Sequence, residues 1–281
     1  MKRGLQFGAA IVGLGVFVFA ARHLDLHALF ASLRTMNPVL ALVAMIVVLV
    51  GKVGSKAVRS QRLLETECRR AGCAAPSLAT TTRLLLASHA AGQLAWGPLG
   101  FTVRTVALQA EGMPIKAVAR VHVAERIAEA CGIAAVALIA VAPLGPFQFV
   151  ASTLALVLLV DLMLISFGFA LARATAWAFA SSVADLAVLF LASRAMHVDV
   201  SLAPILLAFL AINAAYLLPT PGQLGVQEAA ITVAFAAAGI AAPEALACAL
   251  AYRCVHLVAL GLVGVPALIA TWLPQRRPVT A

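Results

Sequence analysis

The sequence predicts an all-α polytopic membrane protein made of two inverted repeats, with about six full transmembrane helices and two re-entrant helical hairpins. Three observations lead to this fold class. Of the 281 residues 63% are hydrophobic and only 11% are charged, so a water-soluble fold would expose large apolar patches. The apolar residues form runs of about 20, which is the length of one membrane crossing. Two further apolar stretches are interrupted by proline and glycine.

Six uninterrupted apolar runs are long enough to cross a bilayer. They lie at about 4–21, 38–58, 116–142, 147–171, 174–195 and 244–271. The first run follows two basic residues and therefore also has features of a cleaved signal peptide. Because its apolar part is long for such a peptide, we expect it to be a retained first span.

The stretches 79–112 and 203–238 are predicted to be helical hairpins. The first is broken by WGPLG (96–100) and the second by PTPGQLG (219–225), and each half is short for a crossing. Proline and glycine leave backbone groups that hydrocarbon cannot satisfy, so such breaks are tolerated only against protein or a wet cavity. We therefore expect both stretches to enter the membrane and turn back.

The basic residues support this topology. With cytoplasmic termini and both hairpins returning to their side of entry, fourteen of the twenty Lys and Arg residues lie on the cytoplasmic side, as positively charged loops usually do. Two hairpins that cross fully remain the alternative.

The segment 59–72, with four arginines and two glutamates, is predicted to be a cytoplasmic loop on anionic head groups. This topology also accounts for the net charge of +9 without nucleic acid.

An internal repeat indicates two related halves within one transmembrane domain, 1–281. The stretch GMPIKAVARVHVAER (112–126) precedes GIAAPEALACALAYR (239–253) by 127 residues, with Gly, Ala and Arg in register. We assign 1–142 to the first repeat and 143–273 to the second, each with three spans and one hairpin. An odd number of crossings makes the halves inverted, an architecture in which transporters bind substrate near the midplane.

The candidate site consists of polar residues within apolar spans. Arg126 and Arg253 each lie about ten residues into a span, roughly 14 Å deep, where a charge requires a partner or water. Two interpretations stay open: the charges pair with each other and lock helices together, or they line a cavity for an anionic head group. Candidate binding residues are Pro98, Gly100, Arg104, Glu125, Arg126, Pro221, Gly222, Gly225, Glu228, Tyr252 and Arg253.

Three further acids are candidates for coupling transport to protons or cations: Glu129, Asp161 and Asp185. The five cysteines follow no zinc or disulfide pattern, and no catalytic nucleophile, phosphate-binding loop or cofactor motif is present in the sequence. We therefore predict no metal, no cofactor and no catalytic residues.

Several segments together resemble the lysylphosphatidylglycerol synthase transmembrane-region family, also called the flippase-like domain family. They are DLHALF (25–30), RSQRLL (59–64), PLGFTVR (98–104), the pair Glu125 and Arg126, PGQLGVQE (221–228), and Tyr252 with Arg253. The resemblance spans nearly the whole chain. The second break matches the family pattern Pro-Gly-x-x-Gly-x-x-Glu, whereas GPLG (97–100) lacks the glutamate that usually follows the first break.

The resemblance implies membrane-lipid handling in a bacterial inner membrane, without lysyl transfer, because no aminoacyltransferase domain follows the membrane part. We expect a carrier that moves a polar-headed lipid, such as a phospholipid or a polyprenyl-linked or hopanoid-type lipid, between leaflets. Its partners would be membrane lipids and lipid-biosynthesis enzymes, with no nucleic acid. The alternatives are a non-transporting scaffold of a lipid-biosynthesis complex and an intramembrane enzyme acting on a lipid phosphate.

Overall fold

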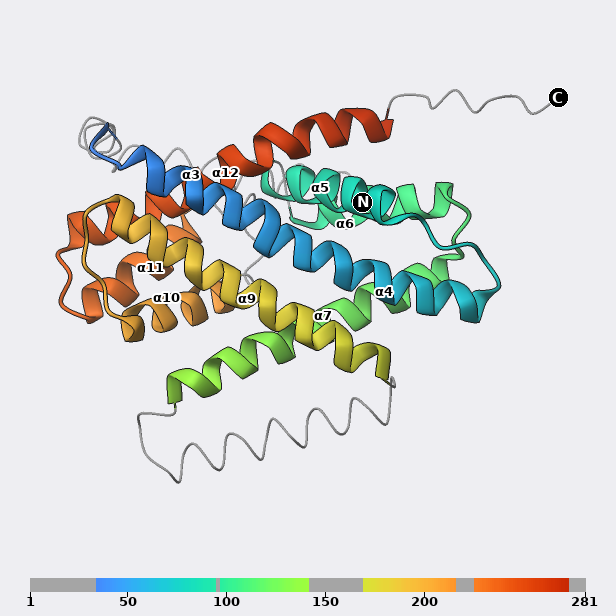
Figure 1. Ribbon diagram of the computed structural model, residues 1–281, viewed down its shortest axis with the longest axis horizontal. Coiled ribbons are helices and arrows are strands. Elements are labelled where there is room, and N and C mark those ends of the chain that lie inside the picture. Colours follow the sequence, from blue (N-terminus) through green and yellow to red (C-terminus); the bar gives the residue numbers. More distant parts are fainter. Residues whose placement is uncertain (1–33, 95–96, 142–168, 216–224, 273–281) are drawn as a thin grey trace, which may run out of the picture.

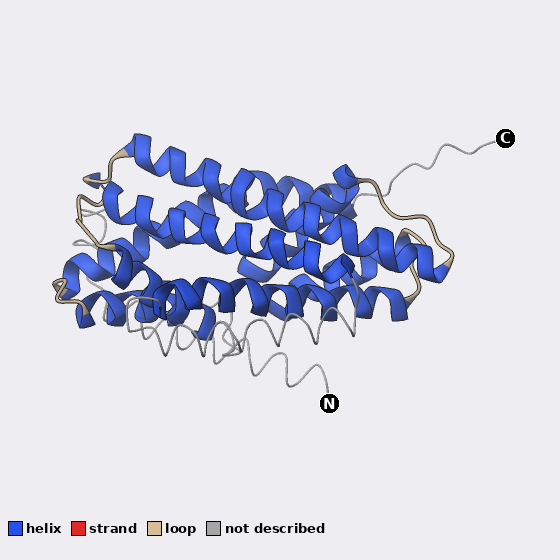
Figure 2. Cartoon of the chain, turned by 60° about the horizontal axis from the view of Figure 1, so that its bottom comes forward, coloured by secondary structure: helices blue, strands red, loops and turns tan. Residues whose placement is uncertain are grey.

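The computed structural model describes residues 34–94, 97–141, 169–215 and 225–272. Within these ranges the chain is helical and forms no strand, which confirms the all-α fold class (Figure 2). The helical segments in chain order are α3 (Pro38–Ile46), the π-helix η1 (Val47–Val53), α4 (Gly54–Ala71), α5 (Leu78–Leu94), α6 (Gly97–Ala110), α7 (Ile115–Val141), α9 (Phe169–Ala195), α10 (Leu202–Ala215), α11 (Val226–Ala237) and α12 (Ala242–Trp272).

Within the described ranges, three stretches of helix are long and apolar enough to cross a membrane: Pro38–Ala71, Leu171–Ala195 and Ala242–Thr271. They contain three of the predicted spans. Their outer faces carry large apolar side chains that are more than half exposed, including Val39, Val50 and Leu262, as expected of a surface that faces lipid. The predicted span 116–142 is helix α7, whose charged residues interrupt its apolar run. The predicted span 4–21 and the predicted span 147–171 up to residue 168 lie outside the described residues.

Helices α3, η1 and α4 form one continuous rod of 34 residues (Figure 1). Asn37 caps its start, since its side-chain oxygen accepts hydrogen bonds from the backbone N–H groups of Val39 and Leu40. The π-helical segment inserts a wide turn in the middle of this rod and contains Lys52. The prediction of a loop at 59–72 is wrong, because α4 continues to Ala71.

Helix α4 extends through this segment because one of its faces is apolar and packs against other helices. Leu63, Leu64 and Cys68 recur along that face and are buried with residues of α7 and α9. The arginines and glutamates of the segment suggested a solvated loop, but they occupy a helix with an apolar side. The helical spacing of Leu63, Leu64 and Cys68 could have predicted a helix over 59–72, but the many charged residues of the segment favoured a loop.

The two interrupted stretches form helix pairs, α5 with α6 and α10 with α11, whose members pack against each other. Helix α6 begins at Gly97, so Pro98 occupies its first turn, where proline is tolerated. The pair α5–α6 crosses at Gly100, where an added Cβ would lie only 2.3 Å from the backbone oxygen of Ser88. Glycine at this position is what lets the two helices approach so closely.

The two largest groups of buried apolar residues form most of the core that the described helices share. One lies among α3, α9, α10, α11 and α12, and the other among α4, α5, α6, α7 and α9. Helix α9 takes part in both and runs through the middle of the molecule (Figure 1). Each helix pair is followed by a long helix, α7 or α12. The inverted orientation of the two halves, their boundary and the re-entry of the hairpins stay predictions.

Candidate functional site: buried ion pairs between helices

A bidentate ion pair joins α6 to α7. The two terminal nitrogens of Arg104 donate to the two carboxylate oxygens of Glu125 over 2.6 and 2.7 Å. Both residues are about 5% exposed. Ser60 of α4 donates its hydroxyl to the same carboxylate, so three helices meet at Glu125. Paired, parallel hydrogen bonds of this kind fix both the distance and the orientation of the helices that carry them.

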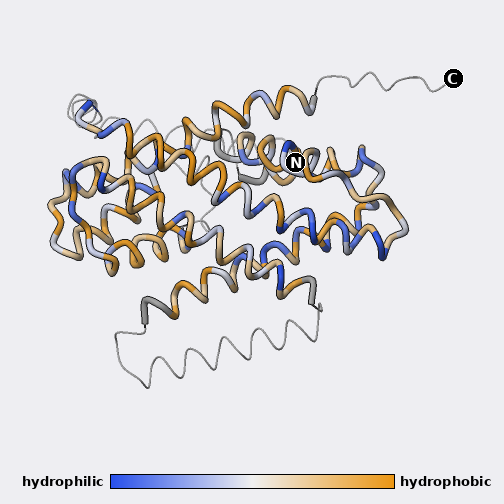
Figure 3. The backbone as a smooth tube through the Cα atoms, viewed as in Figure 1, coloured by the Kyte–Doolittle hydropathy of each residue, from blue (hydrophilic) through white to orange (hydrophobic). Residues whose placement is uncertain are grey.

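Glu129 lies one turn further along α7 and collects three cations. Its Oε1 is 2.8 Å from Nζ of Lys56 and 3.7 Å from a guanidinium nitrogen of Arg59, both on α4. Its Oε2 accepts a 2.7 Å hydrogen bond from Arg126. The side chain of Arg126 is 63% exposed and its guanidinium lies over the ring of Phe101 at 4.6 Å. Hydrophilic residues accordingly gather on α4 and the neighbouring part of α7 (Figure 3).

A third polar cluster joins η1, α9 and α12. Asp185 of α9 accepts hydrogen bonds from Lys52 over 2.7 Å and from the hydroxyl of Tyr252 over 2.9 Å. Nε2 of His256 lies 3.2 Å from the same carboxylate oxygen. Asp185, which the sequence left without a visible partner, is therefore the acceptor at the centre of a buried network.

Arg253 contacts the helix that follows the second break. One of its terminal nitrogens donates to the side-chain oxygen of Gln227 over 2.9 Å, and its Nε lies 3.7 Å from Glu228. The other oxygen of Glu228 accepts from the backbone N–H of Gly225, which precedes α11 with φ of 81°. The glutamate of the Pro-Gly-x-x-Gly-x-x-Glu motif thus stabilises the start of its own helix.

Both helix pairs contact the long helix that follows them through an arginine and a glutamate, with the charges exchanged. Arg104 on α6 pairs with Glu125 on α7 at 2.6 Å, whereas Glu228 on α11 lies 3.7 Å from Arg253 on α12. Each contact ties the second helix of a pair to the long helix after it.

The structure separates some residues that the sequence placed together. Arg126 and Arg253 have different partners, and Arg126 is largely exposed and not buried at depth. Gly100 lies at the crossing of α5 and α6. Pro221, Gly222 and Asp161 lie outside the described residues.

Sequence reasoning missed several residues of these clusters, four of them on the rod formed by η1 and α4: Lys52, Lys56, Arg59 and Ser60. The three basic residues were assigned to the cytoplasmic side, as charge alone suggests. The helical spacing of Lys56, Arg59 and Ser60 was the available signal, because it places them toward the same neighbouring helix.

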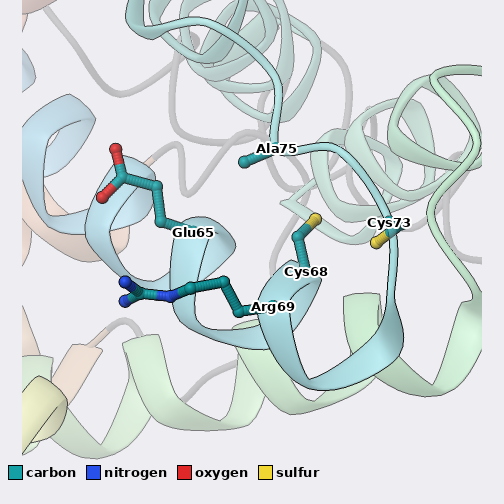
Figure 4. A pocket seen from close by; sticks show the side chains of 5 residues that line it. All are labelled: Glu65, Cys68, Arg69, Cys73 and Ala75. Atoms are coloured by element: carbon teal, nitrogen blue, oxygen red, sulfur yellow. The ribbon is translucent and has the colours of Figure 1, made fainter.

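A small pocket lies apart from the clusters, near the end of α4. It is lined by Glu65, Cys68, Arg69, Cys73 and Ala75 (Figure 4). None of the predicted site residues lines it. Among the described ranges, no group of three or more His, Cys, Asp or Glu residues is arranged to hold a metal ion.

Comparison with known families supports the resemblance over one part of the chain. Residues 163–264 match the family model described as Lysylphosphatidylglycerol synthase TM region. The match covers α9, α10, α11 and most of α12, which is less than half of the chain. It confirms the family suspected from the motifs. No curated protein matches the sequence.

Proposed function

We propose that the chain is a membrane carrier that moves a lipid with a polar, anionic head group between the two leaflets. The family match relates the chain to the transmembrane part of proteins named for lysylphosphatidylglycerol synthesis. The observation that carries the proposal is the concentration of buried charge among apolar helices, at Glu125, Glu129 and Asp185 with their cations. A charged group at membrane depth is costly and usually marks a pathway for a polar substrate.

Lipid transport would use the charge-exchanged pairs at the two hairpins. Arg104 with Glu125 and Glu228 with Arg253 each connect a hairpin to a long helix, so rocking one half against the other would move hairpin and helix as a unit. The exposed Arg126 offers a first contact for a phosphate at the surface of α7, because arginine donates two parallel hydrogen bonds to such a group.

Coupling to protons is assigned in this proposal to the Asp185 cluster. An acid, an amine and an imidazole are in direct contact there. Protonation of Asp185 would break its ion pair with Lys52 and so loosen η1 from α9. A change in protonation at one buried carboxylate could thereby favour one arrangement of the helices.

Leaflet exchange in proteoliposomes tests the proposal. Fluorescent phosphatidylglycerol is placed in both leaflets, and the loss of outer-leaflet fluorescence after a membrane-impermeant quencher reports movement. We expect the protein to accelerate the second, slow phase of quenching. Arg126→Gln should slow that phase, whereas Arg120→Gln, on the same helix and 66% exposed, should leave it unchanged.

The result also separates the carrier from its rivals. If no phospholipid, polyprenyl phosphate or hopanoid exchanges faster with the protein than without it, the carrier proposal is wrong. Copurification with a lipid-biosynthesis enzyme would then favour a scaffold. Product formation from a lipid phosphate in detergent, abolished by replacing Glu125 and Glu129, would favour an enzyme.

A further inference from the structure

Arg59 is a buried cation with two unused donor nitrogens. Its side chain is 5% exposed, yet its Nε and Nη1 atoms are enclosed and have no hydrogen-bond partner among the residues that the structure describes. Its contact with Glu129, at 3.7 Å, is an ion pair beyond hydrogen-bond distance. A desolvated guanidinium with unused donors is unfavourable, so its retention requires a reason.

The neighbouring carboxylates do not hydrogen-bond Arg59 in this arrangement: its Nη2 lies 3.7 Å from Glu129, and the oxygens of both acids already accept from other groups. Both oxygens of Glu125 accept from Arg104, and one also accepts from Ser60. In Glu129, Lys56 contacts one oxygen at 2.8 Å and Arg126 the other at 2.7 Å. Arg59 lies between the two acids and is the surplus cation of the group.

Charge counting shows what would complete this cluster. Four cations contact two carboxylates: Lys56, Arg59, Arg104 and Arg126 with Glu125 and Glu129. The surplus is therefore two positive charges; the one on Arg126 is largely exposed to solvent, and the other is buried, where low dielectric makes an imbalance expensive. A monoanion would leave one charge uncompensated, whereas a dianion would balance the cluster.

We propose that this cluster, between α4 and α7, binds a phosphate monoester in its dianionic form. Arg59 would donate to the phosphate from one of its enclosed donors, Nε or Nη1, and Lys56 and Arg126 would bind from either side. Glu129 holds the same three cations in the structure and would yield to the ligand. Arg126 is exposed enough to move aside and admit it.

This inference rests on the proposed function and gives it a substrate class: lipids whose head group ends in a phosphate monoester. Such a group carries nearly two charges above its second pKa of about 6, whereas a phosphodiester carries one. The carrier should therefore discriminate phosphatidic acid from phosphatidylglycerol with the same acyl chains.

Binding to the purified protein in detergent at pH 8 tests the proposal. We expect phosphatidic acid to bind roughly tenfold more tightly than phosphatidylglycerol, by native mass spectrometry titration. Arg59→Gln should weaken phosphatidic acid roughly tenfold to a hundredfold and abolish the preference. Arg62→Gln is the matched control, because this arginine lies on the same helix with a 58% exposed side chain.

Inorganic phosphate and glycerol 3-phosphate serve as water-soluble competitors of phosphatidic acid in the same binding experiment. If they compete with phosphatidic acid as strongly as the lipid itself binds, the same cluster takes a free phosphate and not a lipid. If they compete weakly, the acyl chains contribute and the ligand is a lipid. Equal affinity for both lipids, unchanged by Arg59→Gln, would overturn the assignment.

Thermal unfolding without ligand gives a second readout that does not depend on binding. Arg59→Gln removes an uncompensated buried charge, so the variant should melt at a higher temperature than the natural protein, whereas Arg62→Gln should not change it. A lower melting temperature would show that Arg59 is satisfied within the protein, and the proposal would be wrong.

The two proposals fail in different ways. Leaflet exchange that is equally fast for phosphatidic acid and phosphatidylglycerol would refute the phosphate-monoester site and leave the carrier in place. Selective binding of phosphatidic acid without exchange of any lipid would refute the carrier and leave the site.

Discussion

Replacing Glu125 by Gln should destabilise the protein strongly, because Arg104 would keep its charge while losing its counter-ion. Arg104 is only about 5% exposed and both of its hydrogen bonds to the carboxylate are shorter than 2.8 Å. Removing one partner of a buried ion pair costs about 3–5 kcal/mol. For a chain of this size that corresponds to a fall in melting temperature of roughly 6–10 °C.

Thermal unfolding in detergent, followed with a thiol-reactive dye or by light scattering, measures this fall. Glu65→Gln is the matched control, because Glu65 pairs with the exposed Arg62 at 3.4 Å and such surface pairs are worth at most about 1 kcal/mol. The double variant Arg104→Met with Glu125→Leu should recover most of the loss, since it leaves no unpaired charge.

Equal melting temperatures for Glu125→Gln and Glu65→Gln would refute the reasoning. They would mean that water or another group reaches Arg104 once the carboxylate is gone. A double variant no more stable than the single one would show instead that packing around the pair, and not its charge, holds α6 against α7.

Gly100→Ala should lower the melting temperature, because the new Cβ would lie 2.3 Å from a backbone oxygen and overpacking costs about 1–3 kcal/mol. The control is Gly261→Ala, which has open space around it and should be neutral or stabilising. Calorimetry compares the melting temperatures of the two variants. Asp185→Asn should remove any response of leaflet exchange to a transmembrane pH difference, and should lower stability less when combined with Lys52→Met. Gly97→Cys, in a background without native cysteines, should react with an impermeant thiol reagent only from the cytoplasmic side; labelling from the periplasm alone would reverse the topology.

The sequence predicted well what depends on local composition. Long apolar runs located the helices at 38, 174 and 244, and proline with glycine indicated that new helices begin after each break, as α6 does at Gly97 and α11 at Val226. Arg104 and Glu125 were also identified, because single charges in apolar runs stand out. The family match over 163–264 confirmed the resemblance that the motifs suggested.

The sequence could not predict which charged residues on different helices contact each other. Lys52 lies 133 residues from Asp185, and nothing local in either segment indicates that they touch. Arg59 was placed in a loop and Lys56 at the cytoplasmic end of a span, because positively charged stretches beside a span usually stay at the membrane surface. Their burial depends on Glu129 of α7 and on the apolar face of α4, which only the packed structure brings together.

The wide turn of η1 determines in which direction the side chains of α4 point around the helix axis. Each residue advances an α-helix by about 100°, so deleting a single residue such as Val50 would turn α4 by that angle relative to α3. Lys56 and Arg59 would then no longer point at α7. One extra peptide unit in the rod thus keeps Lys56 and Arg59, which follow it, directed at Glu129 while Lys52 within it contacts Asp185.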